Sequence, residues 1–415
     1  MSSTGSRVRP VEAHQEAVRA LLAHSLQPRV QERVLADAAG RILAEEITAP
    51  GSLPPFANSQ MDGYAVNSAD LTNAPERGRV ELKVAAPIPA GAQAPPLASG
   101  TAAPIMTGAM LPYGADAVVP IERSQPDTFY AAGESAGARV SLPAGVPAGQ
   151  FVRAAGSDIA AGAPALARGT RLGPAQLGLL AALGIAAVPV LAPVRVALLS
   201  TGDEVVEPGQ ELAPGQIHDA NTTLLAASLA EAGAEVIRSR ILADSPADFR
   251  AALRNELTRG QVDMVVTSGG ISKGAYEVVR LALAAEGVEF FSVAMQPGGP
   301  QGLGTVDGVP LLGFPGNPVS ALVSFEVFLR PALTALTGLP LPRRAVRAVL
   351  AAGTDSPAGK LQIRRGLFRD GGVELIGGPG SHLVHALAGS NALVLIPAGT
   401  DHLPAGAEVT VWLLE

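Results

Sequence analysis

The pattern of hydrophobic and polar positions divides the chain into regions of different texture. Val11, Val18 and Leu22 recur at near-helical spacing, and the segment "VQERVLADAAGRILAEEI" does likewise, so the pattern predicts two amphipathic helices before Pro50. From Gly51 to about Leu166, runs such as "VELKVAAPI" and "GADAVVPIE" are bounded by Gly and Pro, which is typical of a β-rich region. "GPAQLGLLAALGI" then predicts a return to helix.

Strand and helix patterns alternate from about residue 194 onward. Predicted strands are "VRVALLS", "AEVIRSRIL", "VDMVVTSGG", "VEFFSVAM" and "VPLLGF". Predicted helices between them are "NTTLLAASLAEAG", capped by Asn221, "SPADFRAALRNELT", capped by Ser245, and "YEVVRLALAAEG". One long helix, "VSALVSFEVFLRPALTALTG", follows the last strand. Such alternation predicts a parallel sheet with helices on both faces.

The last part of the chain returns to short β-type runs. Pro340 and Pro342 mark a break, and "RAVL", "KLQIRRGLF", "GVELIG", "NALVLIPAG" and "AEVTVWLLE" follow it. We therefore expect a multi-domain α/β plus β fold, with a three-layer α/β/α parallel-sheet catalytic domain, a β-rich insert lobe and a small C-terminal β domain. The expected divisions are an N-terminal helical and linker segment (1–50), the insert lobe (51–158), a linker lobe (159–193), the α/β domain (194–338) and the C-terminal domain (342–415).

Composition and charge narrow the functional classes. Nearly half of the 415 residues are hydrophobic (47%) and only 16% are charged, which argues for a folded, multi-domain protein. The net charge of −7, with lysine only at Lys83, Lys273 and Lys360, leaves no basic face for a nucleic acid. Absence of cysteine excludes thiolate metal sites and cysteine nucleophiles. The longest apolar stretch, from Leu177, is interrupted at Gly184, so we expect no membrane span and a cytoplasmic location.

Polar loops should converge at the carboxyl ends of the predicted parallel strands, where ligands of such sheets bind. "LLSTGDEV", Asp244 and "TSGGISKGAY" each follow a strand. Ser268, Gly269 and Gly270 lack bulk, so their amides suit an anion such as phosphate, and Lys273 lies close enough to add charge. The alternative is a tight structural turn that needs positive φ at glycine. The spacing differs from that of a nucleoside-triphosphate loop.

A second loop, "GFPGNPVSA", opens the long helix. It contains Pro315, Gly316, Asn317 and Pro318, which stiffen the turn and present helix amides, although such proline turns are often purely structural.

Carboxylates gather at the same predicted edge. They are Asp203, Glu204, Asp219, Asp244 and Glu277. Beside an anion site they indicate a cation, and Mg²⁺ binds through one or two carboxylates together with substrate phosphates. Each acid alone is equally consistent with a helix cap or a solvated loop. The histidines His218, His382 and His385 are predicted to lie on the surface or behind the ligand-contacting residues.

The insert contains its own polar loops, to which spacing alone assigns no role. "NSQMDGYAV" carries Asp62, which could be part of a hairpin turn with Gly63. "IMTGAMLPYGADAVVPIE" carries Thr107, and "RAAGSDIAAG" carries Asp158.

Taken in order, these motifs resemble the molybdopterin molybdenumtransferase family, the MoeA type, which is similar to the E domain of gephyrin. Matching stretches are "NSQMDGYAV", "MTGA", "GSDI", "LLSTGDEV", "GQIHDAN", "TSGGIS", "GFPGNPVSA", "QIRRG" and "GSHL". The resemblance implies that molybdate is inserted into adenylylated molybdopterin with Mg²⁺ and that AMP is released. It also implies a homodimer whose active site lies between the α/β domain of one subunit and the insert of the other. Molybdopterin adenylyltransferase and molybdoenzyme chaperones are the implied partners.

The resemblance also implies roles for particular residues. Those expected to be catalytic are Asp62, Thr107, Asp158, Glu204, Asp244 and Glu277, with Glu204 and Asp244 as metal ligands. Those expected to bind the pterin substrate are Ser268, Gly269, Gly270, Lys273, Pro315, Gly316, Asn317, Pro318, Arg365 and Ser381.

Three stretches depart from the family pattern: the arginine-rich run before Asp158 is reduced, Ala275-Tyr276-Glu277 replaces an acidic-Asp-Tyr pattern, and one motif loses lysines. Where the family commonly shows "KPGKP", this chain has "QPGGP", so lysines are replaced by Gln296 and Gly299. The alternative is therefore a divergent paralogue that binds molybdopterin nucleotide as a carrier, scaffold or regulator. A third hypothesis is an enzyme of the sister adenylylating type, whose domain resembles residues 194 to 338. The domains that flank this region in the present chain argue against it.

Overall fold

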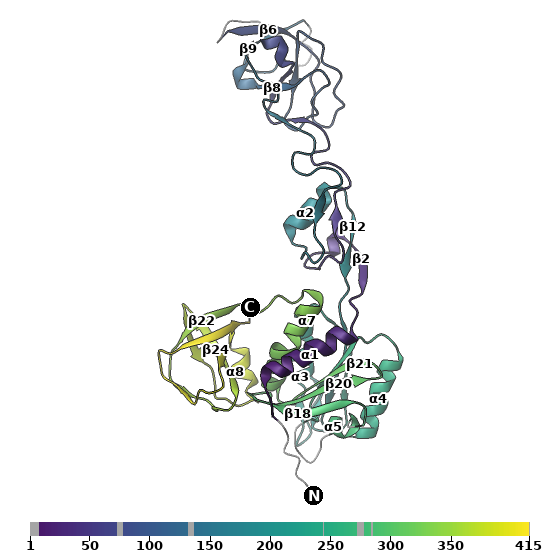
Figure 1. Ribbon diagram of the computed structural model, residues 1–415, viewed down its shortest axis with the longest axis vertical. Coiled ribbons are helices and arrows are strands. Elements are labelled where there is room, and N and C mark those ends of the chain that lie inside the picture. Colours follow the sequence, from purple (N-terminus) through teal and green to yellow (C-terminus); the bar gives the residue numbers. More distant parts are fainter. Residues whose placement is uncertain are drawn as a thin grey trace. The chain divides into compact units, whose positions relative to one another are not determined.

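The computed structural model describes residues 8–72, 78–131, 137–243, 245–271, 278–283 and 285–414. The chain forms two compact units (Figure 1). The first combines residues 1–31 with 191–415, and the second comprises residues 32–190.

The first unit is built on a seven-stranded sheet. Its strands in spatial order are β1 (Val8–Arg9), β18 (Val288–Val293), β20 (Pro300–Val306), β21 (Val309–Phe314), β17 (Met264–Ser268), β13 (Arg195–Thr201) and β16 (Glu235–Leu242). Strands β21, β17, β13 and β16 run parallel, as predicted. Strand β20 is antiparallel to both of its neighbours, so the prediction of a wholly parallel sheet is wrong.

Strand β20 escaped prediction because its sequence, "PQGLGTV", lacks a run of β-branched residues. Its glycines are needed because the neighbouring strand leaves no space for a Cβ at these positions. A Cβ at Gly302 would lie 2.8 Å from the Phe290 ring, and one at Gly304 would lie 2.4 Å from the Gly287 carbonyl oxygen. Tertiary packing therefore overrides the low strand propensity of glycine here.

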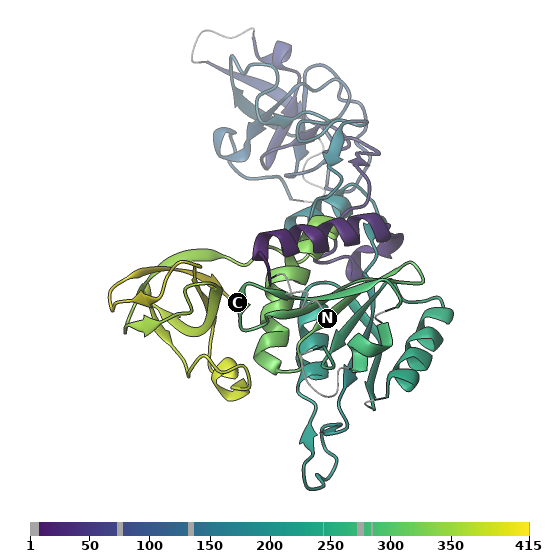
Figure 2. The ribbon, with the colours of Figure 1, turned by 60° about the horizontal axis from the view of Figure 1, so that its bottom comes forward.

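Helices cover both faces of this sheet. Val196 and Leu198 of β13 belong to the same hydrophobic core as α3 (Asn221–Glu231), whereas Ala197 and Leu199 pack with α4 and α5. The other helices are α1 (Val11–Ser25), α4 (Pro246–Thr258), α5 (Val278–Leu283), α6 (Pro318–Ser324) and α7 (Arg330–Thr337). Figure 2 shows α1 crossing the long helix that α6 and α7 form.

The predicted long helix is present, with a π-helical turn, η4 (Phe325–Leu329), between α6 and α7. Residues Pro318–Thr337 are long and apolar enough to cross a membrane, but 72% of the most apolar window is buried inside the protein. A core helix meets the same criterion, and its burial marks this one as a core helix.

The prediction of a second N-terminal helix is wrong. Its residues form β2 (Val30–Val34), a 3₁₀ turn η1 (Leu35–Asp37) and β3 (Ile47–Thr48). Gly40 adopts a φ of 75°, and its amide donates to the Leu172 carbonyl at 2.7 Å. The apolar spacing was compatible with a helix, but pairing with a distant segment decided the conformation.

The second unit is rich in short strands, as predicted for the insert. Its five-stranded sheet has the order β8 (Ala117–Pro120), β5 (Gly63–Val66), β7 (Thr101–Ile105), β6 (Arg79–Val84) and β9 (Arg139–Pro143). Smaller elements are β4 (Asn58–Ser59), β10 (Val152–Arg153), β11 (Pro164–Leu166), β12 (Ala187–Leu191), α2 (Pro174–Ala182), η2 (Ser68–Leu71) and η3 (Ile121–Arg123).

The C-terminal region forms a six-stranded sheet within the first unit. Its order is β19 (Met295–Gln296), β24 (Leu361–Arg369), β25 (Gly372–Leu375), β22 (Ala345–Leu350), β28 (Glu408–Leu413) and β26 (Ala392–Ile396). Strand β24 also pairs with β26. The predicted strands are confirmed, whereas β19, which comes from the α/β region, was not predicted. Short elements are β23 (Thr354–Asp355), β27 (His402–Leu403) and α8 (Val384–Ala388).

Candidate functional site

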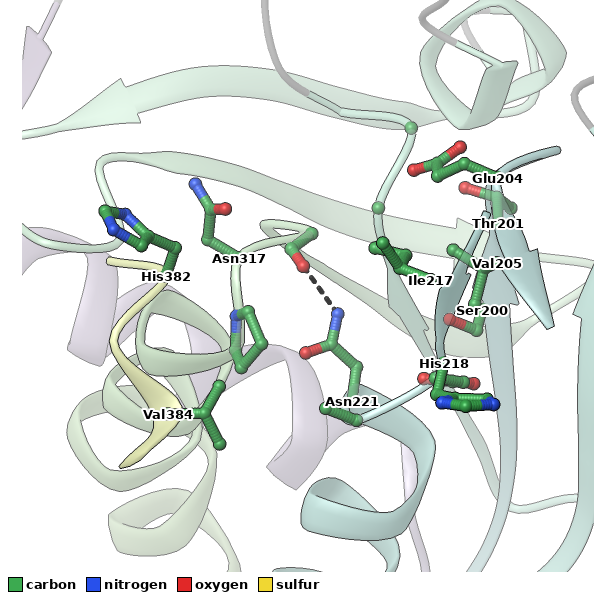
Figure 3. Close-up of a pocket in the computed structure, with 17 residues that line it drawn as sticks. Ser200, Thr201, Glu204, Val205, Ile217, His218, Asn221, Asn317, His382 and Val384 are labelled. Atoms are coloured by element: carbon green, nitrogen blue, oxygen red, sulfur yellow. Dashed lines mark hydrogen bonds between the residues drawn. The ribbon is translucent and has the colours of Figure 1, made fainter. Parts of the chain in front are cut away.

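A cleft of about 700 Å³ lies at the carboxyl ends of β13, β17 and β21 (Figure 3). It is also bordered by the short strands β14 (Val205–Val206) and β15 (Ile217–His218). The lining residues are Ser200, Thr201, Gly202, Glu204, Val205, Ile217, His218, Asp219, Ala220, Asn221, Gly269, Gly270, Gly316, Asn317, Pro318, His382 and Val384. Three of the loops predicted at one sheet edge, those after β13, β17 and β21, therefore meet in one cleft, whereas Asp244 of the fourth lies outside the described residues.

The glycine turn after β17 packs tightly against the loop after β13. Gly269 and Gly270 have φ values of 92° and 64°. A Cβ at Gly269 would lie 2.7 Å from the Thr201 carbonyl oxygen, and one at Gly270 would lie 2.9 Å from the Thr201 hydroxyl. The turn thus requires glycine for conformation and for space. The turn also lines the cleft, but the Gly269 amide donates to the Phe314 carbonyl at 3.1 Å. The structural explanation therefore holds for Gly269, and anion binding by this turn stays a prediction.

Several buried polar atoms near this turn have no hydrogen-bond partner among the residues that the structure describes. They are the hydroxyls of Thr201, Thr267 and Ser268 and the Asn221 Oδ1. A buried polar group left unpaired costs roughly 1–3 kcal/mol, so such groups are rare except where function requires them. Their concentration at the end of two adjacent strands indicates a polar binding site.

Asn221 connects two walls of the cleft. Its Nδ2 donates to the Gly316 carbonyl at 2.6 Å, which ties the start of α3 to the proline loop (Figure 3). The prediction that Asn221 caps this helix is wrong, because Asn221 is already the first helical residue. The Asp219 carboxylate takes that role by accepting from the amide and hydroxyl of Thr222. Both Asp219 carboxylate oxygens are therefore used to cap α3.

The predicted acidic set is only partly described. Glu204 lines the cleft and is exposed, but Asp244, Glu277 and the predicted anion-binding Lys273 lie outside the described residues. Within the described ranges, no three His, Asp or Glu side chains come together as a metal site. A carboxylate such as that of Glu204 would suit Mg²⁺ beside a bound phosphate, since this ion needs few protein ligands when phosphate oxygens supply others.

The C-terminal region supplies another wall through the loop before α8. Arg365 is 1% exposed and donates to the carbonyls of Gly378 and Gly380, so its described contacts hold this loop. The carbonyl of Ser381 accepts from the Val319 amide at 3.1 Å, next to the start of α6. Burial, and then the neighbouring Arg364, lower the pKa of Arg365.

His218 and His382 both line the cleft. Both are exposed, as predicted, but their place in the cleft lining was not predicted, and neither was that of Thr201 and Asn221. The signal was available for Thr201 and His382, which stand in the motifs "LLSTGDEV" and "GSHL". Pro315 is buried beside the cleft, whereas Gly316, Asn317 and Pro318 line it.

In the second unit, the structure brings two of the predicted residues together. The Thr107 hydroxyl and amide donate to Asp62 Oδ1 at 2.6 and 2.7 Å. These bonds, the hydroxyl bond first, lower the pKa of Asp62, so it is a carboxylate at neutral pH. Asp158 is exposed in another loop, where its amide donates to the Leu53 carbonyl at 3.0 Å.

Family profiles match successive parts of the chain: the MoeA N-terminal region (domain I and II) at residues 9–184, a probable molybdopterin binding domain at 197–335 and the MoeA C-terminal region (domain IV) at 347–414. A Mycobacterium tuberculosis protein named molybdopterin molybdenumtransferase 2 is 43% identical over 98% of this chain and 99% of its own. The chain belongs to the molybdopterin molybdenumtransferase family. This is a family of enzymes.

Other members show the same extent of similarity. The Haemophilus influenzae molybdopterin molybdenumtransferase is 36% identical over 91% of this chain and 92% of its own. A crystal structure of a molybdopterin biosynthesis MoeA protein from Pyrococcus horikoshii superposes with a TM-score of 0.85 at 32% identity, covering 99% of this chain and 100% of the other. The similarity therefore extends over both compact units.

Proposed function

We propose that this molybdopterin molybdenumtransferase family member acts in molybdenum cofactor biosynthesis, taking adenylylated molybdopterin and molybdate and giving molybdenum cofactor and AMP with Mg²⁺. The observation that carries the proposal is the glycine turn, Gly269 and Gly270, which lines the cleft beside the buried Thr201 hydroxyl, a group without a hydrogen-bond partner in the described part of the chain. Bare amides and hydroxyls are the groups that bind phosphate oxygens at a strand-to-helix turn.

Electrostatics at the cleft support a metal-assisted reaction. Glu204 would hold Mg²⁺ together with Asp244, and the ion would neutralise charge on the phosphoanhydride. The Asn317 side chain offers a neutral donor on the other side of the cleft. The residues of the chain bind and orient the two anionic substrates, which is where most of the acceleration arises in reactions of this kind.

The reaction balances without an added redox partner. Two sulfur–molybdenum bonds form while one molybdate oxygen leaves as water with the two thiol protons, and molybdenum is neither oxidised nor reduced. Cleavage of the phosphoanhydride consumes one water and releases AMP, molybdopterin phosphate and protons to solvent. The net conversion is therefore adenylylated molybdopterin plus molybdate to molybdenum cofactor plus AMP.

In this proposal, Asp62 and Thr107 act on the active site of the other subunit of a homodimer. The pair would face the cleft of the other subunit, so that each active site is shared between subunits, with Asp158 nearby in the same lobe. Asp62 would act as a fixed carboxylate, since the Thr107 bonds occupy Oδ1 and leave Oδ2 for a substrate or water. Molybdopterin adenylyltransferase and molybdoenzyme chaperones are the expected partners in the cytoplasm, and no nucleic acid or membrane is involved.

A reconstitution assay tests the proposal. Purified protein is incubated with adenylylated molybdopterin, molybdate and Mg²⁺, and AMP release is followed together with activation of a molybdenum-free apoenzyme. Molybdate-dependent release of AMP is expected. Tight binding of the nucleotide with no molybdate-dependent turnover would contradict the proposal.

That contrary result would instead favour the second candidate, a paralogue that binds molybdopterin nucleotide without inserting metal. One observation supports it. The Gln296 side chain, at a position where the family resemblance places lysine, accepts from Gln362 Nε2 at 3.0 Å and carries no charge.

A further inference from the structure

The described lining of the cleft is poor in positive charge for a site proposed to take anionic substrates. Among the described residues that line it there is no lysine or arginine, and only His218 and His382 can carry a positive charge. Their surroundings differ. His218 Nε2 donates to the Gln210 carbonyl at 2.9 Å, so this ring is engaged within its own loop. The His382 ring has no hydrogen bond to a described residue and is exposed.

Two buried arginines hold the loop that carries His382 by hydrogen bonds to its carbonyl groups. Arg364 donates to the Gly377 carbonyl at 3.0 Å, and Arg365 donates to the carbonyls of Gly378 and Gly380. Both arginines are buried (7% and 1% exposed), and neither forms an ion pair within the described part of the chain. Burial of an unpaired guanidinium is costly, and it lowers the pKa of both groups.

This loop is also anchored at its far end. The Ser381 carbonyl accepts from Val319 at 3.1 Å, and the His382 carbonyl accepts from Val384 at 2.9 Å. A Cβ at residue 380 would lie 3.0 Å from the His382 ring, so Gly380 leaves room for the imidazole. The backbone on both sides of His382 is thus fixed, and Figure 3 shows the ring near Asn317, on the other side of the close-up from Glu204 and Thr201.

We infer that His382 is an oxyanion-binding residue of this enzyme, supplied by the C-terminal region to the cleft at the start of α6. The inference rests on the proposed function. The ligand group is a tetrahedral oxyanion, which two sources can supply: free molybdate or a phosphate of the adenylylated pterin. The buried Arg364 and Arg365 act as positioning residues that fix the loop.

The test compares His382→Gln with His385→Gln. His385 is exposed in the same segment, one helical turn further along in α8, and does not line the cleft. The molybdate concentration at half-maximal AMP release is measured, and the dissociation constant for adenylylated molybdopterin is measured separately without molybdate. Replacing a ring that can carry a positive charge by the neutral amide of glutamine weakens the hydrogen bond to an anion, which should raise one of these constants about tenfold in His382→Gln.

His385→Gln should leave both constants unchanged, and His382→Arg should restore the one that His382→Gln weakens. A rise in the molybdate requirement identifies molybdate as the ligand, and a weaker nucleotide constant identifies the phosphate. Unchanged constants in His382→Gln, with a normal melting temperature, would overturn the inference. If the wild type releases no molybdate-dependent AMP, the proposed function fails, and nucleotide binding of the variants still decides whether His382 holds the phosphate.

Discussion

The hydroxyl and the backbone amide of Thr107 converge on a single carboxylate oxygen of Asp62, at 2.6 and 2.7 Å. The carboxylate is exposed, so its orientation comes from these bonds and not from burial. An exposed acid held in this way is suited to act on a molecule that approaches from outside its own lobe.

Asp62→Ala should therefore abolish AMP release while leaving the protein folded and dimeric. The carboxylate makes no other described hydrogen bond, so its removal should change the free energy of unfolding little. Activity and sedimentation behaviour should be measured together. A folded monomer, or a collapse of the melting temperature, would show that Asp62 is a structural residue.

Thr107→Ala should raise the pKa of Asp62 toward its ordinary value of 3.8, because the largest cause of the lowered pKa is the Thr107 hydroxyl. Thr107→Ser retains the hydroxyl and should leave the pKa lowered. The Asp62 carboxyl resonance can be followed by NMR as the pH is reduced. Identical titration curves in the two variants would mean that the amide alone orients the carboxylate.

Gly270→Ala should eliminate binding of adenylylated molybdopterin. The new Cβ would lie 2.8 Å from the Val279 side chain and 2.9 Å from the Thr201 hydroxyl, at a φ of 64°. Gly260→Ala is a matched control, since Gly260 has a φ of 66° and no atom within 4 Å of the added Cβ. In the control, the free energy of unfolding should fall by only about 1 kcal/mol, the cost of a positive φ at alanine. Its affinity for the nucleotide, measured by calorimetry, should be unchanged.

Gly299→Lys should lower the molybdate concentration required for AMP release, because it returns a positive charge at a position where the family resemblance places lysine. A Cβ there would be 3.4 Å from the Val293 carbonyl oxygen, an ordinary contact. Gly298→Lys is the contrasting variant. Its φ of 94° and a distance of 2.9 Å from Cβ to the Met295 side chain predict loss of stability instead. An unchanged molybdate requirement in folded Gly299→Lys would place the oxyanion elsewhere.

His14 should make the first unit sensitive to acid. Burial, and to a smaller extent Arg9, lower the pKa of His14 from 6.5 to about 3. Below pH 6.5 the His14 imidazole is protonated in the unfolded chain but stays neutral in the folded chain. The free energy of unfolding therefore falls as the pH decreases toward 3. At about pH 5 the expected loss is about 2 kcal/mol relative to neutral pH.

His14→Leu should remove that part of the pH dependence, since leucine does not titrate. His24→Gln is the control on the same helix, because His24 is exposed. Chemical denaturation at about pH 7 and about pH 5 measures the difference. An equal decline in His14→Leu and the wild type would assign the acid sensitivity to other groups.

Much of the site could be anticipated from sequence because its loops follow strands whose hydrophobic runs are unmistakable. Thr201, Gly269 and Gly316 come directly after such runs, and parallel pairing brings the ends together. Pairing partners could not be anticipated. Residues 30–48 fit a helical pattern equally well, and only long-range hydrogen bonds to residues such as Thr170 and Leu172 made them extended.

The role of a polar side chain was harder to predict than its position. Asn221 and Asp219 stand two residues apart, and either could cap the helix. The structure assigns the cap to Asp219 and uses Asn221 to reach Gly316, nearly a hundred residues away in sequence. For the same reason, Arg365 looked like a ligand-binding group from its motif, whereas its described bonds hold a loop in place.

Strand β19 has only two residues, yet it joins the C-terminal sheet to the region that contains the cleft. Met295 and Gln296 pair with β24, and the Leu361 amide donates to the Ala294 carbonyl at 2.9 Å. Arg343 adds buried bonds to Glu326 across the same junction. Heat or denaturant should consequently release the cleft and the C-terminal sheet in one cooperative transition, so that a partially melted protein never keeps the glycine cradle while losing the loop that carries His382.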